Sequence, residues 1–231
     1  MPIRRGDGTG IESIRKGDGT QIAEVRKGDG TVLWQRDAIP DSVVDQFDDG
    51  ELGSEWAFLN APTSFDESGG SLSVTYSDHQ GDRIFESDDW ELLYYEETEI
   101  YWESFRIETQ YSGSAFDGSI AQKGHIGIED ASGSRYGIGV ADEGVDTFTG
   151  IEYSDDNENL TTEADAESAD EIWVKAEYDG TTLTCFFDYG SSFSSWTEGD
   201  TLTTSIPTPI KIGLVGNNNT VDWRYFEGER L

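Results

Sequence analysis

Apolar and polar residues alternate with a period of two along most of the chain between residues 43 and 231. Because successive side chains of a β-strand point to opposite faces, this alternation predicts strands that each bury one face. Turns rich in Gly, Asp and Asn separate the runs, as in an antiparallel β-sandwich or jelly roll. No run has the 3.6-residue period of a helix, and the polar residues 161–170 are expected to form a loop. The predicted strands are residues 71–76, 81–86, 100–110, 123–129, 135–140, 147–153, 171–178, 182–189, 210–215 and 221–228.

The first 36 residues follow a different pattern, a three-fold repeat with a period of eleven residues. Each unit places Gly-Asp-Gly between β-branched residues, at positions 3–9, 14–20 and 25–31. Because glycine adopts positive φ without steric cost, each unit predicts a tight turn within a short β-hairpin. A lone hairpin is only marginally stable in water, so the repeat is expected to dock against further copies or another protein. The chain thus divides into an attachment and oligomerisation segment at 1–36, a linker at 37–42 and a jelly-roll domain at 43–231.

The charge of the chain is strongly negative and unevenly distributed. Fifteen Lys and Arg residues oppose 48 Asp and Glu residues, which gives a formal net charge of −33. So acidic a surface excludes nucleic acids and anionic membranes as partners of the bulk of the protein. The first 36 residues nevertheless hold seven basic and five acidic residues, a net charge of +2, which leaves −35 on the other 195. Such asymmetry indicates two separate roles.

The acid-rich and lysine-poor composition indicates a protein that works in near-saturating salt. In molar salt the Debye length falls to about 3 Å, which screens the repulsion among acidic side chains. An unusually acidic protein from ordinary surroundings is the alternative. The aromatic content, with seven Trp, ten Tyr and eleven Phe residues, argues for a folded core beneath the charged surface. The single cysteine, Cys185, excludes an internal disulfide, and no apolar run is long enough to insert across a membrane.

The N-terminal units, of the form apolar-x-x-Gly-x-x-x-apolar and ending in a Trp, resemble repeats at the N-termini of tailed-virus tail-tip and fibre proteins. The resemblance implies that this segment attaches the chain to other virion proteins. An integrin-type Arg5-Gly6-Asp7 triplet is a weaker interpretation, because the sister units read Lys-Gly-Asp. A calcium-binding β-roll is also weaker, because β-rolls have a shorter period. The residues expected to make the attachment are Arg4, Arg5, Arg15, Lys16, Arg26, Lys27 and Trp34.

The body of the chain resembles the concanavalin A-like lectin and glucanase jelly roll. The segments that carry the resemblance are, in order, residues 45–56, 70–74, 172–187, 210–215 and 221–226. The resemblance implies two stacked antiparallel sheets, one of them concave, and commonly carbohydrate binding. No single segment is specific, and the order of the segments carries the resemblance.

The same family contains glucanases, so paired carboxylates are the feature to expect of an enzyme. Retaining glycosidases hold two carboxylates about 5 Å apart, which on one strand implies a string of the form Glu-x-Asp-x-x-Glu. No predicted strand carries such a string. The two histidines, His79 and His125, have no nucleophile or metal-type neighbour at a suggestive spacing. The chain is therefore expected not to be an enzyme.

Aromatic residues interspersed with acids mark the candidate ligand surface. Sugar sites use aromatic faces for stacking and polar side chains for the hydroxyl groups. Five Trp and Tyr residues fall within residues 90–102, and a further Trp lies in a Ser-rich loop. Core or subunit-interface positions are the alternative, and strand alternation requires one of the neighbours Tyr101 and Trp102 to face inward. The candidate glycan-binding residues are Trp90, Tyr94, Tyr95, Tyr101, Trp102 and Trp196.

No cofactor is expected, although a structural calcium ion is an option at one place. Carboxylate oxygens are the ligands that calcium prefers. Asp45 and Asp48 lie at the expected first strand of the body, and Asp222 lies on the returning last strand. The three side chains would form the calcium site where these strands meet.

These features favour a virion component of a haloarchaeal tailed virus, such as a tail fibre or tip, a baseplate protein or a capsid turret. The basic repeat would attach to the particle, and the acidic jelly roll would bind a glycan or glycoprotein of the host surface. Many weak sugar contacts summed over symmetric copies would give adhesion, with a homotrimer as the expected oligomer. The expected location is the virion surface or extracellular space in high salt. The alternatives are a purely structural decoration protein without a ligand, and a secreted carbohydrate-active enzyme or carbohydrate-binding module.

Overall fold

The computed structural model describes residues 24–26, 32–35, 41–77, 91–96, 99–112, 122–142, 147–153, 157–164 and 169–231. The chain forms two compact units, residues 1–40 and 41–231, which are treated separately. In the first unit, β1 (Glu24–Arg26) and β2 (Val32–Gln35) pair antiparallel and flank the third Gly-Asp-Gly, with Val25 opposite Trp34. This is the third of the three predicted hairpins. The first two lie outside the described residues and stay a prediction.

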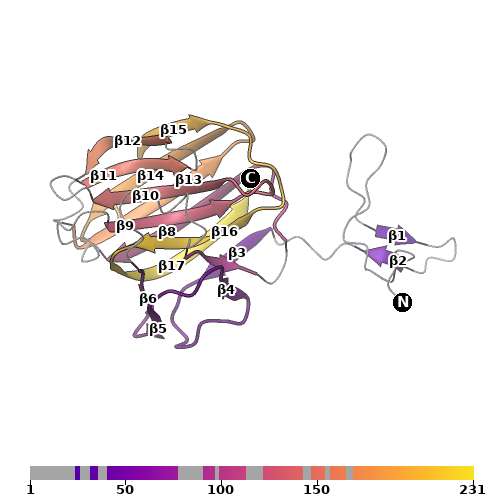
Figure 1. The fold of residues 1–231 in the computed structure, drawn as a ribbon, viewed down its shortest axis with the longest axis horizontal. Coiled ribbons are helices and arrows are strands. Elements are labelled where there is room, and N and C mark those ends of the chain that lie inside the picture. The colour runs from indigo at the N-terminus through magenta and orange to yellow at the C-terminus, as the bar shows by residue number, and fades with distance from the viewer. Residues whose placement is uncertain are drawn as a thin grey trace. The chain divides into compact units, whose positions relative to one another are not determined.

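The second unit is a sandwich of two stacked antiparallel sheets (Figure 1). The β9 sheet has seven strands. Their order across the sheet is β12 (Asn157–Ala164), β11 (Thr147–Tyr153), β10 (Arg135–Asp142), β9 (Gln122–Glu129), β16 (Lys211–Asn217), β7 (Leu93–Tyr95) and β4 (Trp56–Phe58).

The β13 sheet has eight strands and contains the C-terminal strand of the chain. Seven follow in the order β15 (Thr197–Thr203), β14 (Thr182–Gly190), β13 (Glu171–Tyr178), β8 (Phe105–Ser112), β17 (Thr220–Arg230), β6 (Ser71–Thr75) and β5 (Ser64–Ser68). The eighth, β3 (Ser42–Asp45), pairs with the second half of β17. Every element that the described residues form is a strand, which confirms the predicted all-β antiparallel sandwich.

The core lies between the sheets, where period-two alternation turns one face of each strand inward. Along β8 each second residue, from Phe105 to Tyr111, is buried, and the residues between them are half-buried. Tyr111 crosses the core, and its hydroxyl donates a hydrogen bond of 2.8 Å to the carbonyl oxygen of Gly124 on β9. A Cβ at Gly124 would lie 3.0 Å from the Tyr111 ring, so the glycine leaves room for this contact. The hydroxyl is thus satisfied inside the core, as buried polar groups require.

Several observed strands differ from the sequence-based expectations. Residues 161–164, expected to be part of a loop, belong to β12, which pairs with β11 along its length. The expected strand at 100–110 begins at Phe105, and Ile100 forms an isolated bridge with Ile210. Ser42, assigned to the linker, is the first residue of β3. The expected strand at 81–86 lies outside the described residues.

No helix in the described part of the chain is long and apolar enough to cross a membrane.

Candidate functional site

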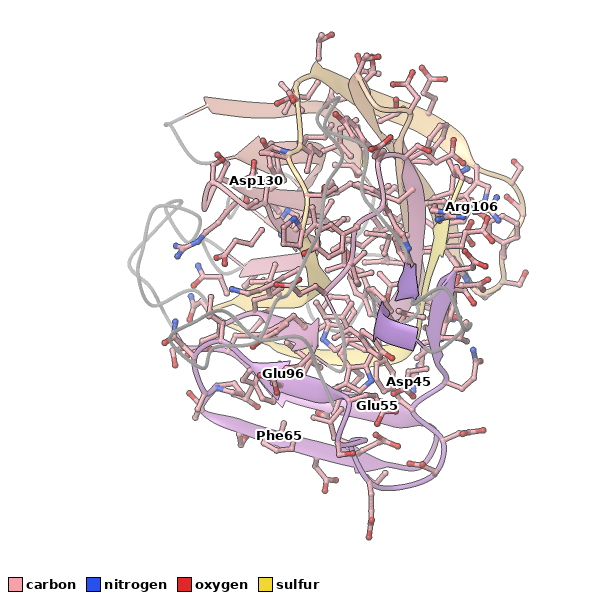
Figure 2. The ribbon with its side chains drawn as sticks, turned by 90° about the vertical axis from the view of Figure 1, so that its right-hand side faces the viewer. Asp45, Glu55, Phe65, Glu96, Arg106 and Asp130 are labelled. Atoms are coloured by element: carbon pink, nitrogen blue, oxygen red, sulfur yellow. The ribbon has the colours of Figure 1, made fainter. Side chains whose placement is uncertain are left out.

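A pocket of about 310 Å³ lies at one end of the β9 sheet. It is bordered by the end of β7, the turn between β9 and β10, and the segment that leads into β16. Glu96 and Asp130, on two of its borders, are labelled in Figure 2. Its lining consists of Tyr94, Tyr95, Glu96, Glu99, Glu129, Asp130, Ala131, Pro209, Ile210 and Lys211.

The position of β7 on β16 brings the two tyrosines to this pocket. In the ladder, Tyr94 lies opposite Gly213 of β16, and Tyr95 lies opposite Trp56 of β4. A Cβ at Gly213 would lie 1.7 Å from the carbonyl oxygen of Leu93, so β7 can approach β16 this closely only beside a glycine. The Tyr95 ring packs edge-on against Trp56, with centroids 6.0 Å apart. The Tyr95 ring therefore lies on the Trp56 side of β7, and alternation turns the Tyr94 ring to the opposite side.

A network of charges joins the β9 and β16 walls of the pocket. The Lys211 ammonium group lies 2.6 Å from Oε1 of Glu129, and Nε of Arg135 lies 3.2 Å from Oε2 of the same carboxylate. Lys211 Nζ also lies 5.4 Å from the centroid of the Tyr94 ring, within the range of a cation–π contact. Glu129 thus holds Lys211 over one face of a lining tyrosine.

Tyr94 is held as a hydrogen-bond donor. Its hydroxyl donates to Oε1 of Glu96 across 3.2 Å. Burial raises the pKa of the Tyr94 phenol, and the hydrogen bond to Glu96 and the negative charges of Glu96 and Glu129 raise it further. Nearby, the Tyr101 hydroxyl donates a hydrogen bond to Oε2 of Glu99. Two lining carboxylates therefore each orient a tyrosine.

Asp130 shapes the border of the pocket. Its Oδ1 accepts hydrogen bonds from the Ser132 and Ser134 N–H groups at 2.8 and 2.9 Å and from the Ser132 hydroxyl at 2.6 Å. The Tyr136 hydroxyl donates to Oδ2 across 3.4 Å. Asp130 therefore fixes the β9–β10 turn, whereas Glu96 and Glu99 each bond a tyrosine and Glu129 contacts Lys211 and Arg135.

Aromatic rings beside hydroxyl, carboxylate and ammonium groups match the chemistry of a sugar site. Rings stack on the apolar faces of a sugar, and carboxylates and lysine bond its hydroxyl groups. The lining holds four carboxylates and one lysine, so its charge opposes an anionic ligand.

The candidate aromatic residues do not all meet at this pocket. Tyr94 and Tyr95 line it, and Tyr101 bonds the lining Glu99. Trp102 is 0% exposed and belongs to the core, so its assignment to the ligand surface is wrong. The alternation that required one of Tyr101 and Trp102 to face inward selects Trp102. Trp196 lies in the loop before β15, on the other sheet.

The other candidates have separate outcomes. Trp90 lies outside the described residues. Among the attachment residues, Arg26 lies on β1 and Trp34 on β2. Arg4, Arg5, Arg15, Lys16 and Lys27 lie outside the described residues, so the attachment role stays a prediction.

The residues named for calcium do not fit a metal site in the described part of the chain. Oδ1 of Asp45 accepts the Phe47 N–H at 2.8 Å, and Oδ2 accepts the Trp56 indole N–H at 2.7 Å. Asp222 of β17 pairs with Ser73 of β6, whereas Asp45 pairs with Phe226, four residues further along β17. The described side chains contain no group of three or more His, Cys, Asp or Glu residues arranged to hold a metal ion.

His125, which appeared isolated in the sequence, has an acidic neighbour in the fold. Its Nε2 lies 3.7 Å from Oε2 of Glu152 on β11, and both side chains are buried. Glu129, a carboxylate that lines the pocket, lies four residues after His125 on the same face of β9. Sequence reasoning missed Glu152, Glu129 and Lys211 because pairing across strands brings them to their partners.

Comparisons with known proteins identify the fold. No protein-family model and no curated protein matches the chain. A variant of the GH43 protein BlXynB from Bacillus licheniformis is 14% identical, with a TM-score of 0.64 over 95% of this chain and 46% of its own. Xylan β-1,4-xylosidase from Bacillus halodurans C-125 is 16% identical, with a TM-score of 0.62 over 94% and 46%. Laminarinase from Flavobacterium sp. UMI-01 is 10% identical, with a TM-score of 0.54 over 81% and 99%.

The chain thus spans less than half of each Bacillus protein and nearly all of the laminarinase. At these identities the likeness concerns the fold. Together with the strand topology, it confirms the predicted concanavalin A-like jelly roll.

The expectation that the chain is not an enzyme is overturned by these comparisons. The similar structures include glycoside hydrolases, so the fold is one that supports glycoside hydrolysis. The expectation rested on a search for paired carboxylates along one strand. In the structure, Glu129 of β9 lines the same pocket as Glu96 and Glu99 of the stretch after β7, and a search along single strands does not detect such a combination.

Proposed function

We propose that the jelly-roll domain binds carbohydrate in the pocket between β7, the β9–β10 turn and β16. The supporting observation is the arrangement of Tyr94 and Tyr95 beside Glu96, Glu99 and Lys211 in one concavity. The Tyr94 ring supplies a stacking surface, and its phenol, with its raised pKa, remains a hydrogen-bond donor at neutral pH. The similar xylosidase and laminarinase structures support a glycan as the ligand class.

A neutral glycan fits the pocket better than an acidic one. The excess of carboxylates in the lining repels uronates, sulfates and phosphates. The volume lies at the lower end of the range for small-molecule sites, which is sufficient for about one or two sugar rings. Laminarin and xylan oligosaccharides are the first probes, because the similar structures include a laminarinase and a xylosidase.

Tyr94→Ala tests the site. Isothermal titration calorimetry in 2–3 M NaCl with laminarihexaose and xylohexaose should show binding to the parent protein. Loss of the stacking ring should weaken binding by about tenfold. Phe65→Ala removes an aromatic ring that is 51% exposed on β5, outside the pocket, and should leave binding unchanged. Equal affinity of the parent and Tyr94→Ala would exclude the pocket.

Glycoside hydrolysis is a second candidate function, favoured by the three carboxylates at the same pocket. Glycosidases work with a pair of acidic side chains that flank the scissile bond. Release of reducing ends from both oligosaccharides should be measured in the same samples. If hydrolysis occurs here, Glu96→Gln or Glu129→Gln abolishes it while oligosaccharide binding persists; hydrolysis that survives both changes excludes this pocket as the catalytic site.

We also propose that residues 1–36 attach the chain to a larger assembly, such as a virus particle in a high-salt environment. The positive charge of this segment, against −35 on the rest of the chain, supports an attachment role. Several copies held in one particle would sum weak sugar contacts into adhesion to a host surface. Deletion of residues 1–36 should abolish incorporation and the expected trimer while leaving oligosaccharide affinity unchanged. Incorporation of the shortened chain would contradict the attachment role.

A further inference from the structure

The outer face of the β13 sheet carries a second group of aromatic side chains. Alternation turns Trp173 and Lys175 of β13 outward, because Ile172, Val174 and Ala176 face the core. In the ladder, Trp173 lies opposite Asp188, and Lys175 lies opposite Phe186 on β14. One outward tryptophan and one outward phenylalanine thus flank a lysine on two neighbouring strands.

The loop between β14 and β15 adds two further rings. Phe193 packs edge-on against Trp173 at 6.1 Å and against Trp196 at 5.1 Å between ring centroids. The Lys175 ammonium lies 4.0 Å from the centroid of Phe186 and 5.1 Å from that of Trp196. We call Trp173, Phe186, Phe193 and Trp196 the aromatic shelf, with Lys175 at its centre.

Asp188 holds the loop in place. Its Oδ2 accepts the Ser194 and Ser195 N–H groups, the latter at 3.2 Å, and its Oδ1 accepts the Ser194 hydroxyl at 3.2 Å. Asp188 is itself buried, so these bonds are shielded from water. The ring of Phe193 nevertheless remains 47% exposed. The chain therefore fixes an aromatic ring at the surface, which lowers the entropy cost of binding there.

Polar groups continue the shelf along the sheet. Gln110 on β8 lies opposite Trp173 and donates to Oε2 of Glu171 across 3.2 Å. Arg224 on β17 lies 3.5 Å from Oε1 of the same carboxylate. Planar amide, carboxylate and guanidinium groups beside stacked rings are the groups that recognise sugar hydroxyls.

The balance of surface area and charge selects the ligand class. Phe193 is 47% exposed and Trp173 only 7% exposed, so the shelf presents a small apolar area compared with the roughly 1,200–2,000 Å² of a stable protein interface. Lys175 and Arg224 are each paired with a carboxylate, Glu177 at 2.8 Å and Glu171 at 3.5 Å, so neither cation is left to attract an anionic ligand. A neutral glycan chain matches both conditions.

We propose that the aromatic shelf is a second carbohydrate-binding site, on the sheet opposite the pocket, for a neutral glycan chain. Each domain would then bind glycans on both sheets and could bridge two chains. The proposal depends on the shelf geometry alone and does not require that the pocket also binds glycan.

Trp196→Ala and Phe193→Ala test the shelf, since both residues belong to the loop and not to the core. Calorimetry of the full chain in 2–3 M NaCl with laminarihexaose and xylohexaose should show two sites for the parent with at least one of these probes. Each shelf variant should lose one site, whereas Tyr94→Ala should lose the other. The Phe65→Ala control should keep both.

Three results would overturn the proposal. One is a single site in the parent that Tyr94→Ala removes and Trp196→Ala leaves unchanged. Another is the absence of binding by the parent to both probes. A third is a dimer that forms without sugar and that Trp196→Ala converts to monomer, as measured by analytical ultracentrifugation. The shelf would then be a contact between copies of the chain. Loss of all binding in Trp196→Ala with full binding in Tyr94→Ala would support the shelf and contradict the pocket.

Discussion

Glu67 on β5 is a buried carboxylate whose surroundings disfavour its charge. Burial is the main cause that raises its pKa, and Asp49 and Asp45 raise it further, against the hydrogen bond from the Gly50 N–H. A carboxyl group with a higher pKa in the folded state binds a proton more readily when folded. The stability therefore falls as the pH rises from the pKa of the unfolded chain through the raised pKa of the folded state.

Glu67→Gln should accordingly raise the free energy of unfolding at pH 7, by about 0.5 kcal/mol. The amide oxygen can still accept the Gly50 N–H, while the repulsion from Asp49 and Asp45 is removed. Denaturant unfolding at pH 7 and pH 4 in constant salt measures the effect, and the difference from the parent should shrink at pH 4. Glu51→Gln, an exposed acid of the same region, is the control. A parent as stable as the variant at pH 7 would contradict this account.

The strands that alternation missed lie mainly at the sheet edges. The end strands of the two sheets are β12, β4, β15 and β5, and none was expected from the sequence. An edge strand pairs on one side and is largely solvated, so its residues show little alternation. β15, for example, is polar at nearly all positions and is placed by its pairing with β14. Strands with partners on both sides, such as β9 and β13, were located well.

The sequence predicts those residues of the candidate site that lie close together along the chain. Tyr94 and Tyr95 fall in one aromatic-rich segment, and the sequence indicates both. Glu129 and Lys211 are 82 residues apart and meet because β16 pairs with β9, with the two residues directly opposite each other. Strand register over such a separation is set by the whole core, so neither residue can be assigned to the pocket from its neighbours in the sequence.

Gly213→Ala should separate β7 from β16. The added Cβ would meet the Leu93 carbonyl oxygen, which is backbone and cannot move without displacing the strand. We expect a loss of about 2–4 kcal/mol in the free energy of unfolding, together with loss of oligosaccharide binding at the Tyr94 pocket. Gly199→Ala on β15 is the matched control, because its Cβ would meet the Phe187 ring at 3.2 Å, and a small shift of the ring relieves the contact. Equal unfolding midpoints for the two variants would contradict the assigned role of Gly213.

Several ion pairs of the folded domain share a partner. Lys211 and Arg135 both contact Glu129, and Arg106 contacts Glu108 and Glu229. With 48 acids and 15 basic residues in the chain, such pairing leaves most carboxylates without a cation. The remaining repulsion acts over the whole surface, and its range is set by the ionic strength of the solvent.

The stability of the domain should therefore depend on salt. Dialysis from 3 M NaCl into dilute buffer lengthens the Debye length, and we expect loss of the β-sheet circular dichroism signal below about 0.5 M. Replacing the exposed acids Glu51, Asp66 and Glu198 by their amides should move this transition to lower salt, because it removes repulsion without touching the core. An unchanged spectrum in dilute buffer would contradict adaptation to high salt. A transition at the same salt concentration in the triple variant would show that salt acts on the burial of apolar surface rather than on charge repulsion.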